Sequence, residues 1–511
     1  MDTTKTLQSF KRGGKALLAC LAPPPGLHMA DMIAMGLIMA ACYFLFMFGD
    51  LGMVSSISYT YLKGHFADFY SYNKATLQMP GYYYLQPLYL LFALWNLPLK
   101  ILGLVDKGPQ GTFNLPAAEL GWTKLLLVVF FALCAVAVYR IARLIAQDGG
   151  QARLCMFLFA SNPLTIYTIF IFAGYDFFGL ALSLFGLYAY LEGRHKHFVI
   201  WFAVAVSFKY FALLPFVPLL LLKEKNLWKI LRSLLAVCVP TAVCYLFTLV
   251  DPGAAGGEVF KDLGVYGDFS LNLGQALIPS TFVLTYLGMC LLAYFTHTGD
   301  DKRKFHKYAI MLTLAASLII FLFKPWNVRW FILITPFLAL AYLFTPNRTF
   351  SLLFETVGSA AMFLRTFFCC SSIVPRDWTN FLVDPSDFTK FNYGAVWANF
   401  WVNSADGYGP IRGFLQPGLM ATGWFVPTKF VPYIDVFTLL YLLFPFLLLL
   451  IRRAEDAWPK PALFKTEAGY IRLRSYGGLA AYLLPVVAVS GIYTWLPALF
   501  EKMTSAVSAI R

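Results

Sequence analysis

Apolar runs about as long as a membrane-spanning helix recur along the chain, and short polar segments separate them. A helix needs roughly 20 apolar residues to cross the hydrocarbon core of a bilayer. The pattern therefore predicts an all-α polytopic membrane protein with about thirteen transmembrane helices. The predicted spans cover about residues 30–49, 122–146, 153–173, 177–192, the two halves of 198–222, 230–250, 280–297, 307–323, 330–345, 349–369, 432–451 and 478–499.

One further apolar run, residues 82–105, is not counted as a transmembrane span. Gln86, Pro87, Pro98 and Lys100 interrupt it. Backbone that departs from a regular span is tolerated at membrane depth where protein or water covers it. We therefore expect this run to form helices that lie in, or dip into, the outer interface. If the run spanned the membrane instead, the orientation of every later helix would reverse.

Composition agrees with the membrane class. Of the 511 residues, 59% are hydrophobic and 13% are charged, and the mean hydropathy is +0.66, whereas soluble domains carry about 25% charged residues. The net charge of +14 comes from basic residues that cluster between the apolar runs, as the positive-inside rule describes. No basic stripe on a soluble fold accompanies them, so nucleic acid is excluded as a partner.

The basic residues also set the predicted orientation. Most Lys and Arg residues fall in alternate connecting segments, which are therefore assigned to the cytoplasm together with the N-terminus. Arg140 and Arg143 end one span, and Arg452 and Arg453 end another. Both placements fit this orientation and argue against its reversal.

Three regions follow from this topology. Residues 1–29 are basic and read as a cytoplasmic lead-in without a cleavable signal peptide. Residues 30–346 form a predicted transmembrane catalytic module whose first outer loop covers 50–121. Residues 347–511 form a C-terminal transmembrane region with an outer loop at 370–431. The nine cysteines show neither disulfide nor zinc spacing, and most lie inside apolar runs.

A polar, aromatic-rich stretch directly after the first span contains the candidate base. The stretch runs from Gly64 to Asn73 and includes His65, Asp68 and Tyr70. Asp68 lies where a membrane boundary is expected, and an ionisable group there is costly unless it pairs or does chemistry. We expect Asp68 to act as the catalytic base, and His65 and Tyr70 to bind substrate. The alternatives are a solvated loop carboxylate and a histidine that only makes hydrogen bonds in the loop.

Three further polar sites reach the same outer face in this topology: Tyr175 with Asp176, then Lys209, then Lys324 with Arg329. Cations at headgroup level can hold the phosphate of a lipid-linked sugar, and a nearby carboxylate can take the proton of an attacking hydroxyl. We expect the three cationic residues to bind the donor phosphate. We expect Tyr175 and Asp176 to bind substrate.

Each of these sites also has a purely structural explanation. Asp176 could cap the N-terminus of the fourth span. Lys209 could extend its ammonium to the interface. Lys324 and Arg329 could anchor the interface beside neighbouring tryptophans. No set of His, Cys, Asp and Glu shows metal-ligand spacing, so we expect no metal and no other cofactor.

Four motifs carry a resemblance to a known group. They are Gly64-His65-Phe66-Ala67-Asp68-Phe69-Tyr70 with Gln86-Pro87-Leu88-Tyr89, Phe172-Ala173-Gly174-Tyr175-Asp176, Ser207-Phe208-Lys209-Tyr210-Phe211, and Lys324-Pro325-Trp326 with Arg329-Trp330. In this layout they resemble the GT-C superfamily of integral-membrane glycosyltransferases, including bacterial mannosyltransferases and the lipid A aminoarabinose transferase type. The resemblance implies a polyprenyl-phosphate sugar donor and inversion at the anomeric carbon. Many members have a paired acidic motif where this chain has Asp68 alone, which leaves a divalent cation open and favours a metal-independent reaction.

The sequence therefore predicts a glycosyltransferase of the outer leaflet, most readily in a bacterial plasma membrane, with its active site outside the cytoplasm. It would move one sugar from a polyprenyl-phosphate carrier to a hydroxyl of an envelope glycan, lipid or protein. A flippase or transporter of lipid-linked sugars is the main alternative, and a non-catalytic scaffold is a second. A transporter would need charged groups along a path through the membrane, whereas the polar groups here gather at one face.

Overall fold

The described part of the chain is a helical bundle. The structure is a computed structural model that describes residues 22–45, 47–77, 84–104, 117–251, 253, 281–323, 328–345, 347–369, 378–379 and 463–480. Within these residues the only strands are β1 (Met47–Phe48) and β2 (Trp378–Thr379), which form a two-residue antiparallel pairing. The all-α part of the fold prediction is confirmed.

The helices occupy most of the predicted spans and the first outer loop. In chain order they are α2 (Met29–Leu45), α3 (Gly49–Leu62), α4 (Phe69–Leu77), α5 (Gln86–Ile101), α6 (Ala117–Ala146), α7 (Gly149–Ala160), α8 (Pro163–Ile166), η1 (Tyr167–Ile171), α9 (Phe178–Leu191), α10 (His195–Phe208), η2 (Tyr210–Ala212), α11 (Leu213–Lys223), α12 (Leu227–Val250), α14 (Thr281–Phe295), α15 (Lys302–Phe323), η3 (Val328–Leu333), α16 (Thr335–Ala341), η4 (Tyr342–Phe344), α17 (Arg348–Cys369), α22 (Glu467–Arg472) and η8 (Leu473–Gly477).

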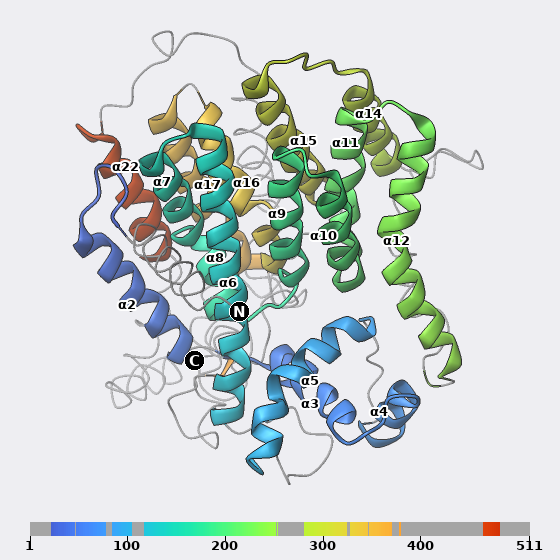
Figure 1. Cartoon of the computed structure of the whole chain (residues 1–511). Helices are drawn as coiled ribbons and strands as arrows, with labels where there is room; N and C mark the ends of the chain where they lie inside the picture. Colours follow the sequence, from blue (N-terminus) through green and yellow to red (C-terminus); the bar gives the residue numbers. More distant parts are fainter. Residues whose placement is uncertain are drawn as a thin grey trace, which may run out of the picture.

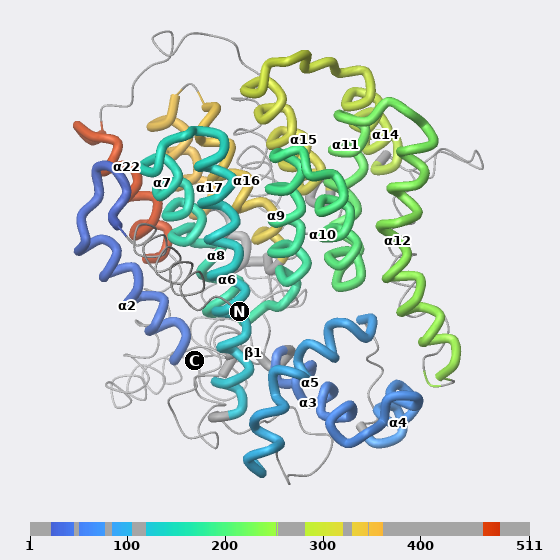
Figure 2. The backbone as a smooth tube through the Cα atoms, viewed as in Figure 1, coloured from blue at the N-terminus to red at the C-terminus, as the bar shows by residue number. Residues whose placement is uncertain are grey.

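The bundle has two distinct ends. In Figure 1 the turns after α6, α9, α11 and α14 lie at the upper end, and α3, α4 and α5 lie below the bundle at the other end. The tube in Figure 2 shows α12 descending from the upper end toward α4. We call the lower end the α4 end. The chain therefore alternates between two ends as the hydropathy pattern predicts, and the assignment of the α4 end to the outer face stays a prediction.

Turns at the upper end are set by local side-chain chemistry. The Asp148 carboxylate accepts hydrogen bonds from the first backbone N–H groups of α7, and the Asn226 side chain does the same for α12. Such caps satisfy donors that have no partner within the helix. Gly193 has a φ of +79° directly after α9, in the left-handed region that commonly ends a helix at glycine.

The apolar helices support the membrane class. Among the described residues, two helices are long and apolar enough to cross a bilayer, Glu119–Ala146 and Leu227–Val250. A third span results if Gly149–Ala160 and Pro163–Ile171, which meet at a bend of 53°, cross together. Several shorter apolar helices accompany them. The total of thirteen stays a prediction, since spans such as 432–451 lie outside the described residues.

The first outer loop contains three helices. The structure places α3 there, with Leu51, Val54 and Ile57 buried, although the sequence analysis expected only loop between the first span and the interfacial run. Helix α5 packs against α3 and α6. Trp95 of α5 and Trp122 of α6 stack, and each indole N–H donates to the backbone carbonyl of the other tryptophan, at 2.8 and 2.9 Å. Helix α5 lies with α3 and α4 below the bundle (Figure 1), and its interpretation as an interfacial helix stays a prediction.

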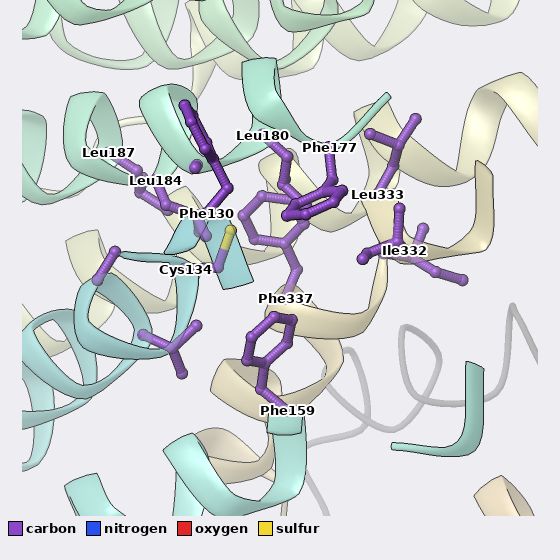
Figure 3. Packing of buried hydrophobic residues seen from close by; sticks show 14 of the residues in the cluster. Phe130, Cys134, Phe159, Phe177, Leu180, Leu184, Leu187, Ile332, Leu333 and Phe337 are labelled. Atoms are coloured by element: carbon purple, nitrogen blue, oxygen red, sulfur yellow. The ribbon is translucent and has the colours of Figure 1, made fainter. Parts of the chain in front are cut away.

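An apolar core joins the bundle helices. Figure 3 shows side chains of α6, α7, α9 and the η3–α16 segment meeting at its centre, among them Phe130, Phe159, Leu180, Leu333 and Phe337. Membrane helices associate largely through such close packing, because lipid tails are as apolar as the side chains. The core fixes α9 and η3, the two elements that flank the candidate site described below.

Buried charges tie distant elements together. The Arg474 guanidinium is fully buried, forms an ion pair with Glu355 of α17, and donates to the Leu158 carbonyl at 2.9 Å. The Lys124 ammonium, 1% exposed, donates to the carbonyls of Tyr43 at 2.7 Å and Phe170 at 2.6 Å. A cation at a helix C-terminus is favoured by the macrodipole. Lys124 therefore joins the end of α2 to the end of η1.

Asp251 joins α12 to α4. Its carboxylate is buried and accepts hydrogen bonds from the backbone N–H of Tyr70 at 2.5 Å and of Ser71 at 3.1 Å, and from the Ser71 hydroxyl. These backbone donors belong to the first turn of α4, where a carboxylate is favoured. The end of a peripheral helix is thus fixed to the helix that follows Asp68.

We predict that Asp251→Ala loosens α4. Loss of a capping side chain costs about 0.5–2 kcal/mol, so the amide hydrogens of α4 should exchange with solvent about 2- to 30-fold faster. The measurement is hydrogen–deuterium exchange by mass spectrometry in detergent. Asp301→Ala is the matched control, because Asp301 caps the exposed first turn of α15 through the Lys304 N–H. Unchanged exchange in α4 of Asp251→Ala would contradict the assignment.

Candidate functional site

Asp176 lies in a break between two helices. After η1 the chain passes through Ala173, whose φ of +53° is in the left-handed region although it is not glycine. The Gly174 N–H donates to the Thr168 carbonyl at 2.8 Å, which turns the chain before α9 begins. Lys124 holds the preceding turn through the Phe170 carbonyl. The break brings the Asp176 carboxylate between the bundle helices at the α4 end.

Lys209 occupies a second break, between α10 and η2, where its backbone is extended. Its ammonium forms an ion pair with Asp176, with 2.8 Å between Nζ and Oδ1. The two side chains are only 15% and 5% exposed. Gly179 of α9 lies close to α10, and a Cβ there would lie 3.2 Å from the Ala205 carbonyl oxygen. The breaks and the glycine together create a buried ion pair.

Aromatic side chains surround this ion pair. The Trp330 indole N–H donates to Asp176 Oδ2 at 3.0 Å, and the Tyr84 hydroxyl lies 3.4 Å from Oδ1. The Lys209 ammonium lies over the Tyr84 ring, 4.5 Å from its centre, and 5.6 Å from the centre of the Phe211 ring. We call these five residues the Asp176 cluster. They come from the first outer loop, the α9 break, the α10–η2 break and η3.

Two small pockets flank the ion pair. One lies between α9, α11, α15 and α16 and is lined by Asp176 and Lys209 together with apolar residues such as Leu180 and Phe337. The other lies toward the first outer loop and is lined by the same pair with Tyr84 and Tyr175. Each pocket therefore places the charged pair beside apolar walls.

Asp68 belongs to a separate, more exposed group. It directly precedes α4, its side chain is 54% exposed, and Oδ2 lies 2.9 Å from His65 Nδ1. The His65 ring stacks on the Tyr72 ring, with 3.7 Å between centres. An exposed carboxylate with a histidine partner can exchange protons with a reacting hydroxyl. The predicted contact between His65 and substrate stays a prediction.

Helix α4, which follows Asp68, contacts the Asp176 cluster through Tyr70. The Tyr70 hydroxyl donates to the Tyr84 carbonyl at 3.1 Å, and Tyr84 contacts Asp176 as described above. Tyr70 is 1% exposed and Tyr175 is 4% exposed. Tyr175 packs edge-to-face on Tyr84 and lines the outer pocket. Both side chains are buried and pack against their neighbours, and the prediction that they bind substrate stays a prediction.

The two remaining predicted cations, Arg329 and Lys324, lie partly or wholly outside the described residues. Arg329 lies in η3 next to Trp330, and its side chain is outside the described residues, as is the whole of Lys324. The structure also bears on the alternatives for Asp176 and Lys209. The residue that caps α9 is Phe177, without a side-chain hydrogen bond, so Asp176 is not its cap. The Lys209 ammonium pairs with Asp176, and the Lys209 side chain is 15% exposed.

Three important residues were missed at the sequence level. Tyr84 is one of three consecutive tyrosines, and nothing in that run distinguishes it. Trp330 was read only as an interfacial neighbour of Arg329. Asp251 directly follows the apolar run 230–250, and nothing in the sequence distinguishes it. In the part of the chain that the structure describes, no group of three or more His, Cys, Asp or Glu side chains could hold a metal ion.

Comparisons of the chain with protein-family models, with curated proteins and with solved structures give no match.

We predict strong coupling between Asp176 and Lys209 in stability. Removing one partner of a buried ion pair leaves an uncompensated charge and costs about 3–5 kcal/mol, whereas removing both costs much less than the sum. Asp176→Asn, Lys209→Gln and the double variant should therefore give strongly non-additive shifts in thermal unfolding in detergent. The control cycle uses Glu224 and Lys229, which are 3.9 Å apart with Lys229 69% exposed, and whose coupling should not exceed about 1 kcal/mol. Additive losses at Asp176 and Lys209 would contradict the buried pair.

Proposed function

We propose that this chain is an inverting membrane glycosyltransferase that uses a polyprenyl-phosphate sugar. The sugar moves to a hydroxyl of an envelope glycan, lipid or protein at the outer face of, most readily, a bacterial plasma membrane. The observation that supports this best is the buried pair of Asp176 and Lys209 beside apolar pockets. A phosphate attached to a long apolar chain needs a cation at headgroup depth with apolar surface beside it.

The two carboxylates would have different roles. Asp176 already accepts hydrogen bonds on both oxygens, from Lys209 and from Trp330, so it suits holding charge and orienting groups. Asp68 is exposed and has one histidine partner, so it suits proton transfer. The proposal therefore keeps Asp68 as the base and gives Asp176 the task of orienting Lys209 and the donor.

The reaction is balanced without another reactant. The acceptor oxygen attacks the anomeric carbon, and its proton passes to the Asp68 carboxylate. The bond between that carbon and the donor phosphate oxygen breaks, and its electron pair leaves with polyprenyl phosphate. Lys209, with Arg329 and Lys324, would stabilise the charge that develops on this phosphate. No metal ion is required by these steps.

We predict that Asp68→Asn lowers the transfer rate by about 10²- to 10⁴-fold, the usual contribution of a general base. The assay offers radiolabelled polyprenyl-phosphate monosaccharides and an envelope glycolipid fraction to protein in nanodiscs, and follows release of polyprenyl phosphate with and without a chelator. The wild type should keep its rate under the chelator.

Asp300→Asn is the control for this experiment, because Asp300 is exposed in the turn after α14 at the opposite end of the bundle; it should behave as wild type. A fully active Asp68→Asn would remove the base assignment. A wild type that consumes no donor but carries labelled lipid across the bilayer would replace the enzyme with the flippase alternative.

A further inference from the structure

Tyr84 makes three separate contacts that join the first outer loop to the buried ion pair. Its ring faces the Lys209 ammonium at 4.5 Å, its hydroxyl lies 3.4 Å from Asp176 Oδ1, and its carbonyl accepts a hydrogen bond from the Tyr70 hydroxyl at 3.1 Å. The ring is itself held edge-to-face by Tyr175 at 5.4 Å and by Tyr89 at 6.4 Å. Its orientation is therefore fixed by its neighbours.

The Tyr84 ring restricts where the Lys209 ammonium can lie. A lysine side chain is flexible and carries a compact charge, and here Asp176 contacts that charge while the Tyr84 and Phe211 rings lie close to it. The attraction between an ammonium and an aromatic face increases when water is excluded, as it is around a side chain that is 15% exposed. The hydroxyl, at 3.4 Å, is at the long end for a hydrogen bond. The ring face is therefore the stronger of the two contacts.

We propose that Tyr84 is the positioning residue for Lys209: its ring face holds the ammonium at the wall of the outer pocket, ready for the phosphate of a polyprenyl-phosphate ligand. This proposal rests on the proposed function for the identity of the ligand. Selectivity for a charged headgroup then depends on the Tyr84 ring of the first outer loop. The ring takes part in no covalent or proton-transfer step.

The first test compares two ligands that differ in one group. Short-chain polyprenyl phosphate and the matching uncharged polyprenol are titrated into wild type, Tyr84→Leu and Tyr84→Phe in nanodiscs, with binding followed by native mass spectrometry. Tyr84→Leu should bind polyprenyl phosphate about tenfold more weakly, within the range of a desolvated cation–π contact, and bind polyprenol as wild type does. Tyr84→Phe keeps the ring and should bind both ligands within about twofold of wild type.

A matched control comes from the other end of the bundle. The Lys225 ammonium lies 5.0 Å from the centre of the Tyr294 ring, so Tyr294→Leu removes a similar contact away from the proposed site. It should leave the binding of both ligands unchanged. In the transfer assay, kcat/KM for the donor should fall about tenfold in Tyr84→Leu and remain at the wild-type value in Tyr294→Leu.

The outcomes separate this proposal from the enzyme proposal. If Tyr84→Leu loses both ligands equally, or neither, or if Tyr84→Phe fails as badly as Tyr84→Leu, the positioning role is wrong. If wild type prefers polyprenyl phosphate and Tyr84→Leu loses that preference, the positioning role stands even when no sugar is transferred, and the proposed reaction alone fails. If wild type shows no preference for the phosphate, the positioning role fails as well.

Discussion

A buried ion pair between Asp176 and Lys209 is the constraint on which the rest of the site depends. Each charge would cost several kcal/mol if it were taken out of water alone, and only a close partner with further hydrogen bonds makes the burial acceptable. Both residues lie at breaks between helices, where the backbone is free to turn a side chain inward. The breaks, the close helix approach at Gly179 and the Trp330 hydrogen bond all serve the same geometry.

The surrounding fold holds these breaks in place from several directions. Lys124 fixes the turn that precedes Asp176 by binding carbonyls of two elements. Asp251 fixes the start of α4, and Tyr70 of that helix contacts Tyr84. Each connection uses a polar group that is satisfied inside the apolar bundle, as buried polar groups must be. The same groups place the exposed pair of Asp68 and His65 at the end of the molecule where the buried pair lies.

Hydropathy predicted most of the bundle helices that the structure describes, because apolar runs and their basic ends are local properties of the chain. Hydropathy also assigned Asp176 and Lys209 to the same outer-face site, because both interrupt apolar runs at that predicted face. Helix α3 was missed because apolar residues alternate with hydroxyl residues along it, so it has no apolar run long enough to indicate a span. Tyr84 and Asp251 could not be predicted, since their roles depend on partners 92 and 180–181 residues away. Of the four predicted polar sites, the structure brings Asp176 and Lys209 into contact. Asp68 lies in a separate exposed group, and Lys324 and the Arg329 side chain lie outside the described residues.

The central claim is that the pair of Asp176 and Lys209 receives the phosphate of a lipid carrier. The most direct test is an experimental structure of the wild type in nanodiscs with bound polyprenyl phosphate. The account predicts phosphate density within hydrogen-bond distance of Lys209 Nζ, beside the Tyr84 ring, with the apolar chain leaving along one of the two flanking pockets. Phosphate density at the opposite end of the bundle, with the buried ion pair untouched, would contradict it.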